Sequence, residues 1–276
     1  MSCKHTPYPV ITSRANAVFK TIFSLQTSKG IKQNGVFLAG GEKIVKEVLL
    51  ECKERIITWI RTPDMPFPPP VLSGVKQVVF SKERFNELNL IGTTGPLLEL
   101  RLPEIARFNT GAPWPAGCSL FIPFSDPENI GAVIRSASGM GVSRVVLLSE
   151  AACPFLPRAV RASAGSILRI RLEYGPALAD IASLPVKVPF YSLDMEGQLL
   201  SDIAWPQSFG LIAGMEGQGL PPGIKEKLIN VAIPLENGLD SLNAATAVSI
   251  ALWDWRTKKC HFFSGTKRLT HELPRM

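Results

Sequence analysis

The sequence predicts an α/β protein with two parts: a larger C-terminal part built on a mainly parallel sheet with helices on both faces, and a smaller N-terminal α/β part. Three observations lead to this expectation. From Cys118 onward, short apolar runs alternate with helical patterns, as in parallel sheets. Residues 101–117 are rich in proline and glycine and interrupt all periodicity. The 276 residues are also enough for two hydrophobic cores.

The N-terminal part, residues 1–112, carries helical and strand patterns in turn. In residues 41–55 the apolar side chains recur with helical spacing, whereas the prolines of residues 63–70 cannot donate to a sheet ladder and predict a loop. We expect, in order, a helix at 13–24, a strand at 35–39, a helix at 41–55, strands at 56–60 and 75–80, and a helix capped by Ser81.

A linker is expected at about residues 101–117, with the boundary near residue 112. The C-terminal part, residues 118–260, then alternates regularly. Strands are expected at 119–124, 144–148, 167–172, 190–195, 209–213 and 231–235. Helices are expected at 129–140, 157–162, 176–183, 221–227 and 243–256. Residues 261–276 form a basic tail without a core pattern, expected to be a flexible segment or an interaction arm.

The composition is that of a globular protein, with 46% hydrophobic and 19% charged residues. No uninterrupted apolar run of about 18 residues suggests a membrane span, and no signal-peptide pattern follows Met1. We therefore expect a cytoplasmic protein without a membrane partner. The net charge of +7 favours an anionic partner, above all nucleic acid, although a basic surface also serves solubility.

Histidine and cysteine usage excludes several kinds of site. The three histidines, His5, His261 and His271, lie near the termini, so the middle of the chain cannot supply a Ser-His-Asp triad or a histidine-rich metal centre. The five cysteines are far apart and form no C-x-x-C pair, which indicates inert thiols. We expect no metal site and a chemistry that runs without imidazole.

Three polar loops carry the candidate site: residues 126–135 (DPENIGAVIR), 211–220 (LIAGMEGQGL) and 240–244 (DSLNA). Each follows a predicted strand, and the carboxyl ends of parallel strands share one edge of a sheet. We therefore expect the loops to meet there. Without histidine or a cysteine nucleophile, they suit a reaction that depends on orientation more than on a strong base.

The first loop opens a helix. Asp126 is a natural N-cap, and the backbone N–H groups after Pro127 suit anions or polar oxygens. Asn129 and Arg135 are six residues apart and could border one cleft. From the spacing alone a purely structural explanation is favoured, with Asp126 as the cap, Asn129 satisfying the turn and Arg135 in a salt bridge.

The second and third loops also admit both kinds of explanation. The glycines of residues 214–219 allow close approach of a ligand, or simply serve a turn. Their order is not the dinucleotide fingerprint G-x-G-x-x-G. Glu216 could hold Arg135, a ligand hydroxyl or an amine. Ser241 and Asn243 lie at the start of the last helix, where Ser241 or Asp240 would also serve as an N-cap.

In order and local sequence the three loops resemble the motifs of the SpoU/TrmH branch of the SPOUT superfamily, RNA ribose 2'-O-methyltransferases that use S-adenosylmethionine. The resemblance covers most of residues 118–256 and rests on D-P-x-N-x-G-A-x-x-R, G-x-E-G-x-G and S-L-N. Arg161-Ala-Ser-Ala-Gly165 is similar to a further family segment. Residues 11–14, 37–42 and 92–95 resemble signals of the family's ribosomal-protein-like substrate-binding domain.

The resemblance implies a deep trefoil knot, a homodimer through the C-terminal domain, S-adenosylmethionine as cofactor and structured RNA as substrate, with rRNA favoured over tRNA. Arg135 would be the catalytic arginine, orienting the ribose 2'-OH rather than deprotonating it, because arginine stays protonated. The supporting polar residues would be Asn129, Glu216, Ser241 and Asn243. The cofactor contacts would be Gly214, Gly217, Ile233, Leu242 and Leu193.

Two alternatives remain at this stage. A catalytically silent RNA-binding relative, acting in ribosome assembly, would have the same basic charge; the presence of all the polar motif residues argues against it. An NAD-dependent α/β enzyme fits the fold class but lacks the glycine fingerprint and its downstream acid.

Overall fold

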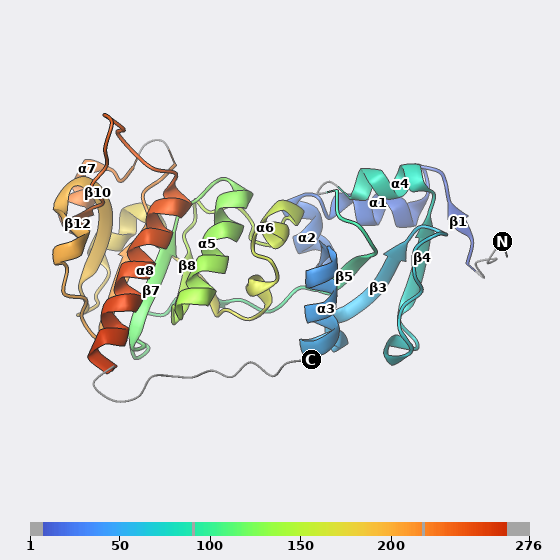
Figure 1. Cartoon of the computed structure of the whole chain (residues 1–276). Coiled ribbons are helices and arrows are strands. Elements are labelled where there is room, and N and C mark those ends of the chain that lie inside the picture. The colour runs from blue at the N-terminus through green and yellow to red at the C-terminus, as the bar shows by residue number, and fades with distance from the viewer. Residues whose placement is uncertain (1–7, 90–91, 217–218, 264–276) are drawn as a thin grey trace.

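The computed structural model describes residues 8–89, 92–216 and 219–263, whose strands form two sheets. The five-stranded sheet occupies one end of the molecule and the seven-stranded sheet the other (Figure 1). The sheets divide between Arg101 and Ala106, inside the predicted linker and ahead of residue 112. Within the described part, no helix has the length and apolarity needed to cross a membrane.

The N-terminal sheet has the strand order β1-β4-β3-β5-β2, with β5 antiparallel to β2 and β3. Its helices begin at polar caps: Asn16 accepts hydrogen bonds at the start of α1, and Thr27 at the start of α2. The elements are β1 (Val10–Ile11), α1 (Ala17–Ser24), α2 (Ser28–Asn34), β2 (Val36–Gly40), α3 (Glu42–Glu51), η1 (Lys53–Arg55), β3 (Ile56–Arg61), η2 (Pro70–Leu72), β4 (Lys76–Phe80), α4 (Lys82–Leu88) and β5 (Leu97–Arg101).

The C-terminal sheet has the strand order β12-β10-β11-β7-β8-β9-β6, and its described pairs are all parallel. This confirms the predicted α/β class with a mainly parallel sheet. The elements are β6 (Ala106–Arg107), β7 (Gly117–Ile122), α5 (Pro127–Met140), β8 (Arg144–Leu147), α6 (Pro157–Ala162), η3 (Ser166–Leu168), β9 (Leu172–Tyr174), η4 (Leu178–Ser183), β10 (Phe190–Leu199), η5 (Leu200–Asp202), β11 (Ser208–Ile212), α7 (Pro222–Lys225), β12 (Ile229–Ala232) and α8 (Ala244–Phe263).

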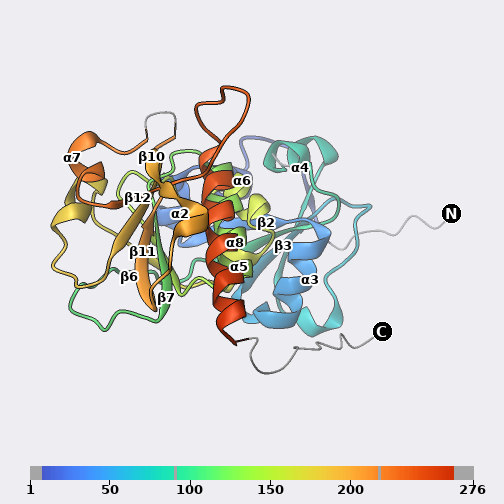
Figure 2. The same cartoon turned by 60° about the vertical axis from the view of Figure 1, so that its left-hand side comes forward.

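Both faces of this sheet are covered. Along the central strand β7, Leu120 and Ile122 pack in the cluster that contains α5 and α8, whereas Phe121 packs in the cluster of η4 and α7. Burial on both faces explains why the strand is a continuous apolar run rather than an alternating one. Helices α5 and α8 lie alongside each other (Figures 1 and 2), joined by a 2.8 Å hydrogen bond between Ser249 and Ser136.

The predicted strand at 167–172 is wrong. Residues 166–168 form η3, and β9 begins only at Leu172. The chain turns at Ala164 and Gly165, where φ is positive (47° and 87°), and then runs into a tight 3-10 turn. A short apolar run cannot by itself distinguish a strand from a helical turn.

The predicted strand at 231–235 is shifted. Strand β12 runs from Ile229 to Ala232 and stops ahead of Pro234, which has no N–H to donate to the ladder. Ile233 therefore leaves the sheet, and it lines the cavity described below. The predicted helix at 176–183 is the 3-10 turn η4, and the sequence analysis did not anticipate α2, β5 or β6.

The predicted linker is packed against the C-terminal sheet. Its strand β6 pairs with β9, and the rings of Phe108 and Trp114 lie against Phe121. The same two rings hold the buried guanidinium of Arg144, 4.8 and 4.5 Å from their centroids, and Arg144 pairs with the buried Glu173 at 3.3 Å. Pairing and stacking offset the cost of burying these charges.

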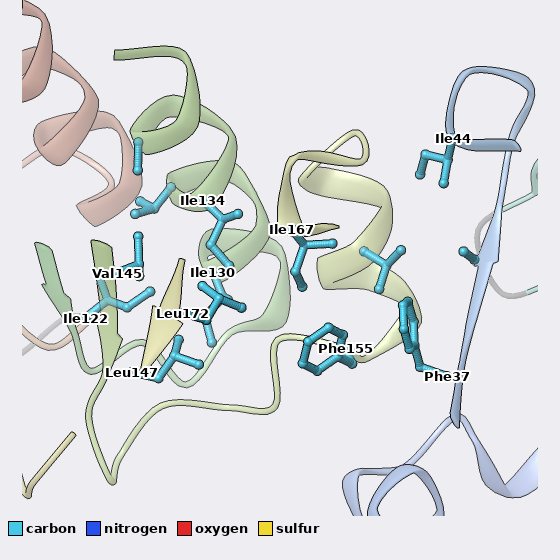
Figure 3. Packing of buried hydrophobic residues seen from close by; sticks show 14 of the residues in the cluster. Phe37, Ile44, Ile122, Ile130, Ile134, Val145, Leu147, Phe155, Ile167 and Leu172 are labelled. Atoms are coloured by element: carbon cyan, nitrogen blue, oxygen red, sulfur yellow. The ribbon is translucent and has the colours of Figure 1, made fainter. Parts of the chain in front are cut away.

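The two ends of the molecule meet at an apolar junction. Phe155, which precedes α6, faces Phe37 of β2 with 4.9 Å between ring centroids (Figure 3). Arg169 adds a bidentate ion pair with Glu51 of α3 at 2.6 and 2.7 Å. Both ionic side chains are more than 40% exposed, so this pair contributes at most about 1 kcal/mol. The apolar contact stabilises the junction more, because burying a phenylalanine contributes roughly 1.5–3 kcal/mol.

Gly131 sets the close packing of α5 on α6, and we predict that Gly131→Ala destabilises the protein by roughly 1–3 kcal/mol. An added Cβ would lie 2.2 Å from the carbonyl oxygen of Ala159 and 2.7 Å from the Cβ of Ala162. The matched control is Gly139→Ala on the same helix, where an added Cβ meets nothing within 4 Å and the gain in helix propensity is up to about 1 kcal/mol. In urea denaturation, Gly131→Ala should lower the free energy of unfolding and Gly139→Ala should leave it unchanged or raise it. Equal changes for the two variants would contradict the close packing of α5 on α6.

Candidate functional site

The carboxyl ends of the parallel strands border an open cavity of about 320 Å³. Its walls come from the segment after β7, from β10, from the loops after β11 and β12, and from the first turns of α8. The volume is within the range of roughly 300–1,000 Å³ that is typical of small-molecule sites. All three predicted loops contribute to it, so the expectation that they meet at one sheet edge is confirmed.

The carboxylate of Glu216 ties the second loop to the first. Its Oε2 accepts hydrogen bonds from the N–H and the hydroxyl of Ser125, at 3.0 and 2.7 Å, and from the N–H of Asp126 at 3.1 Å. Its Oε1 accepts a hydrogen bond from the amide nitrogen of Asn129 at 2.5 Å. One short segment therefore satisfies both oxygens of the carboxylate.

These hydrogen bonds favour the ionised form of Glu216. Burial alone raises the pKa of its carboxyl, but the side-chain bonds from Asn129 and Ser125 and the backbone bonds from Asp126 and Ser125 outweigh burial, so the pKa falls below its ordinary value. The ionised carboxylate of Glu216 therefore connects the second loop to the first through hydrogen bonds. A carboxylate in this state is a poor proton acceptor.

Asn243 joins the third loop to the same network. Its amide nitrogen donates to Oδ1 of Asn129 at 3.0 Å, and its own Oδ1 accepts from the N–H of Thr246 at 3.1 Å, which caps α8. The helix thus begins at Ala244, and it extends beyond the predicted end at residue 256. The N-cap is Asn243 rather than Ser241 or Asp240. Asn129 bridges Glu216 and Asn243, which fixes the orientation of its amide.

Of the three partners considered for Glu216, Arg135 is not the one that the structure shows, because the hydrogen bonds to both carboxylate oxygens come from the first loop. Arg135 is exposed on α5 and does not line the cavity. Six residues separate it from Asn129, about 9 Å along the helix axis and on a different side of the helix. The structure therefore brings Asn129, Glu216 and Asn243 together and leaves Arg135 outside their cluster.

The residues expected to contact a cofactor lie in the cavity wall. Leu193, Gly214, Ile233 and Leu242 all line it, as does the exposed Ser241. A Cβ on Gly214 would lie 3.1 Å from the Cα of Gly219, at the point where the two ends of the loop pair. The close approach explains glycine here. The predicted contact Gly217 lies outside the described residues.

Sequence reasoning missed two residues of the site. Ser125 supplies two of the bonds to Glu216, and Asp194 lines the cavity from β10. Asp194 was hidden because it belongs to a predicted strand rather than a polar loop. Gly197 lies just beyond the predicted strand at 190–195; had the strand been extended to its observed end at Leu199, this isolated glycine would have indicated a bulge. Across the described ranges, no group of three or more His, Cys, Asp or Glu side chains could hold a metal ion.

Residues 120–253 match the model of the SpoU rRNA methylase family. The chain is 40% identical over 247 residues to the ribosomal RNA small subunit methyltransferase G 2 of Syntrophobacter fumaroxidans. The aligned region covers 89% of this chain and 48% of that relative. The chain belongs to the SpoU/TrmH family. It is also 28% identical over 252 residues to the 23S rRNA (guanosine(2553)-2'-O)-methyltransferase RlmP of Bacillus subtilis, covering 89% of this chain and 98% of RlmP.

Solved structures extend the likeness of this SpoU/TrmH protein to its whole fold. The AdoMet-bound rRNA methyltransferase from Sinorhizobium meliloti superposes with a TM-score of 0.75 at 22% identity, covering 91% of this chain and 98% of that one. An RNA 2'-O ribose methyltransferase gives a TM-score of 0.76 at 19% identity, over 91% and 100%. At such identities the likeness shows a shared fold. The chain spans about half the length of the relative from Syntrophobacter.

We predict that Glu216→Gln lowers the free energy of unfolding by about 1–3 kcal/mol at pH 7, because an amide cannot accept all four hydrogen bonds. Since folding lowers the pKa of Glu216, its contribution is present above about pH 4.3 and is lost as the pH falls through the lower, folded value. The difference between wild type and variant should therefore shrink below that pH.

Chemical denaturation of both proteins between pH 3 and pH 7 measures this difference. The control is Glu226→Gln, which changes an exposed carboxylate next to α7 that has no hydrogen bond or ion pair in the described part of the chain. A constant difference across the pH range for Glu216→Gln would contradict its role as an ionised tie.

Proposed function

We propose that this protein is an S-adenosylmethionine-dependent RNA methyltransferase that modifies a ribose 2'-OH. The observation that carries the proposal is the cavity, in which the three family loops meet and are joined by hydrogen bonds through Asn129, Glu216 and Asn243. The cytoplasm is where we expect it to act on RNA. The family of the chain and the names of its relatives support the same class of reaction.

The cavity wall suits S-adenosylmethionine. Leu193, Ile233 and Leu242 present apolar surface to a flat base, and Gly214 lets backbone N–H and C=O groups approach the ligand. When bound, this cofactor supplies an electrophilic sulfonium methyl group. The protein then needs to exclude water, hold a hydroxyl in line with that methyl and let its proton leave.

The residues of the polar network have different roles in this proposal. Glu216 is a positioning residue, because it accepts four hydrogen bonds from the first loop and its lowered pKa disfavours proton transfer. Asn129 and Asn243, held by it, lie in the cavity wall and can orient a substrate hydroxyl. Ser241 lies exposed in the same wall, where it can contact the RNA.

Arg135 fits a role on the substrate side. It is exposed and lies on the helix that carries Asn129. We propose that it contacts the ribose or the adjacent phosphate, since guanidinium binds phosphate strongly and remains protonated.

We favour rRNA as the substrate. The support is the net charge of +7, which suits a phosphate backbone, the N-terminal α/β unit that would hold structured RNA, and the rRNA substrates in the names of relatives such as RlmP. A 2'-OH is what distinguishes RNA from DNA, so DNA should not be a substrate. The silent RNA-binding alternative is disfavoured because the hydrogen-bonded network is complete.

The proposal includes the trefoil knot and the homodimer. In support of the knot, α8 starts after the edge strand β12 and packs against α5, which connects β7 and β8, so the chain passes back beyond β10 and β11. In support of the dimer, Trp253 is 58% exposed on α8, the helix that packs against α5. Exposed tryptophan is typical of interfaces.

For Arg135→Ala we predict a loss of methyl transfer of at least about 100-fold, with the Kd for S-adenosylmethionine changed less than about threefold. Methyl transfer is measured with tritiated methyl groups passed from the cofactor to total RNA, and mass spectrometry of the RNA locates the modified ribose. Calorimetry measures the Kd for S-adenosylmethionine. Arg101→Ala, an exposed arginine of β5, is the control. Near-normal turnover of Arg135→Ala would refute the role, and cofactor binding without any transfer by the wild type would support the silent alternative.

Trp253→Glu should dissociate the homodimer, raising its dissociation constant at least about 100-fold, because a buried charge without a partner is costly. Size-exclusion chromatography with light scattering measures the mass. Leu50→Glu is the matched control, since Leu50 is 85% exposed on α3 of the N-terminal unit and should leave the dimer intact. A wild-type protein that is monomeric at micromolar concentration would sink the dimer proposal.

A further inference from the structure

Strand β10 makes a short excursion at the edge of the cavity. Leu193 and Gln198 both pair with Val231 of β12, so residues 194–197 are extra residues that leave the ladder. A Cβ on Gly197 would lie 2.3 Å from the carbonyl carbon of Asn230, and only glycine lets the excursion close against β12. The excursion places Asp194 and Met195 in the cavity wall.

The carboxylate of Asp194 is held by one oxygen only. Its Oδ1 accepts from Lys225 Nζ at 2.8 Å and from the N–H of Glu196 at 3.0 Å. Among the described residues, no hydrogen bond reaches Oδ2. The carboxylate is therefore fixed in place while retaining a free acceptor, and its side chain is 21% exposed.

The rest of the wall favours a cationic ligand group. Its described lining residues include the acids Asp194, Glu216 and Asp240 and no lysine, arginine or histidine. Both oxygens of Glu216 already accept hydrogen bonds from the first loop, and Asp240 lies on an exposed loop. Asp194 is the acid that combines a fixed position with an open oxygen.

We propose that Asp194 accepts a hydrogen bond from the α-ammonium group of S-adenosylmethionine and so selects ligands that carry the amino acid arm. The inference rests on the proposed function. An ammonium group meets both features of the site, because it is a cation and a hydrogen-bond donor. Ribose hydroxyls are also donors, but they carry no charge.

Three ligands separate these possibilities. S-adenosylmethionine and S-adenosylhomocysteine both carry the ammonium group, whereas 5'-methylthioadenosine keeps the adenine, ribose and sulfur and lacks the amino acid arm. For Asp194→Asn we expect Kd, measured by calorimetry, to rise about tenfold for the first two ligands and less than about twofold for the third. Retained binding of 5'-methylthioadenosine also shows that the variant is folded.

Glu196→Gln is the matched control. Glu196 pairs with the same Lys225 at 2.8 Å but is 83% exposed and does not line the cavity, so its loss should leave all three affinities unchanged. If Asp194→Asn weakens 5'-methylthioadenosine as much as S-adenosylhomocysteine, or leaves S-adenosylhomocysteine unchanged, the inference is overturned while the proposed function stands. If the wild type binds no S-adenosylmethionine, the inference about Asp194 and the proposed function are both refuted.

Discussion

The site depends on the hydrogen bonds that converge on the carboxylate of Glu216. Four donors from Ser125, Asp126 and Asn129 hold it, and Asn129 passes the constraint on to Asn243. Three loops far apart in sequence thereby become one wall. The parallel sheet makes the tie possible, because it delivers the carboxyl ends of β7, β11 and β12 to one edge.

The same packing links the site to the N-terminal unit. Helix α5 carries Asn129 and Arg135, and Gly131 on that helix allows close contact with α6. Helix α6 in turn contacts β2, beside the junction of Phe155 and Phe37. An RNA held by the N-terminal unit would therefore meet the proposed active site at a defined spacing. An RNA methyltransferase needs a defined distance between its RNA-binding unit and its active site, because the reacting hydroxyl must be aligned within a fraction of an ångström.

Most of the regular elements could be predicted because their apolar runs have the period of the structure they form. The prediction failed where local sequence is ambiguous. Residues 167–172 are apolar enough for a strand, yet the turn at Ala164 and Gly165 makes a 3-10 turn of their first part. Strand β6 was hidden in a proline-rich stretch, because two residues pairing with β9 leave no periodic signal. In the site, Asp194 was missed because it sits inside a strand pattern.

The sequence by itself determined the α/β class, the three loops and the family to which the chain belongs. These features are local, since they depend on the period of apolar residues and on the order of a few polar ones. The tertiary structure decided the partners: Glu216 binds the first loop instead of Arg135, Asn243 caps α8, and Asp194 keeps an open oxygen beside the cavity. The first and third of these choices depend on contacts between segments that are not neighbours in sequence, 90 residues apart in the case of Glu216, and no pattern along the chain contains such contacts.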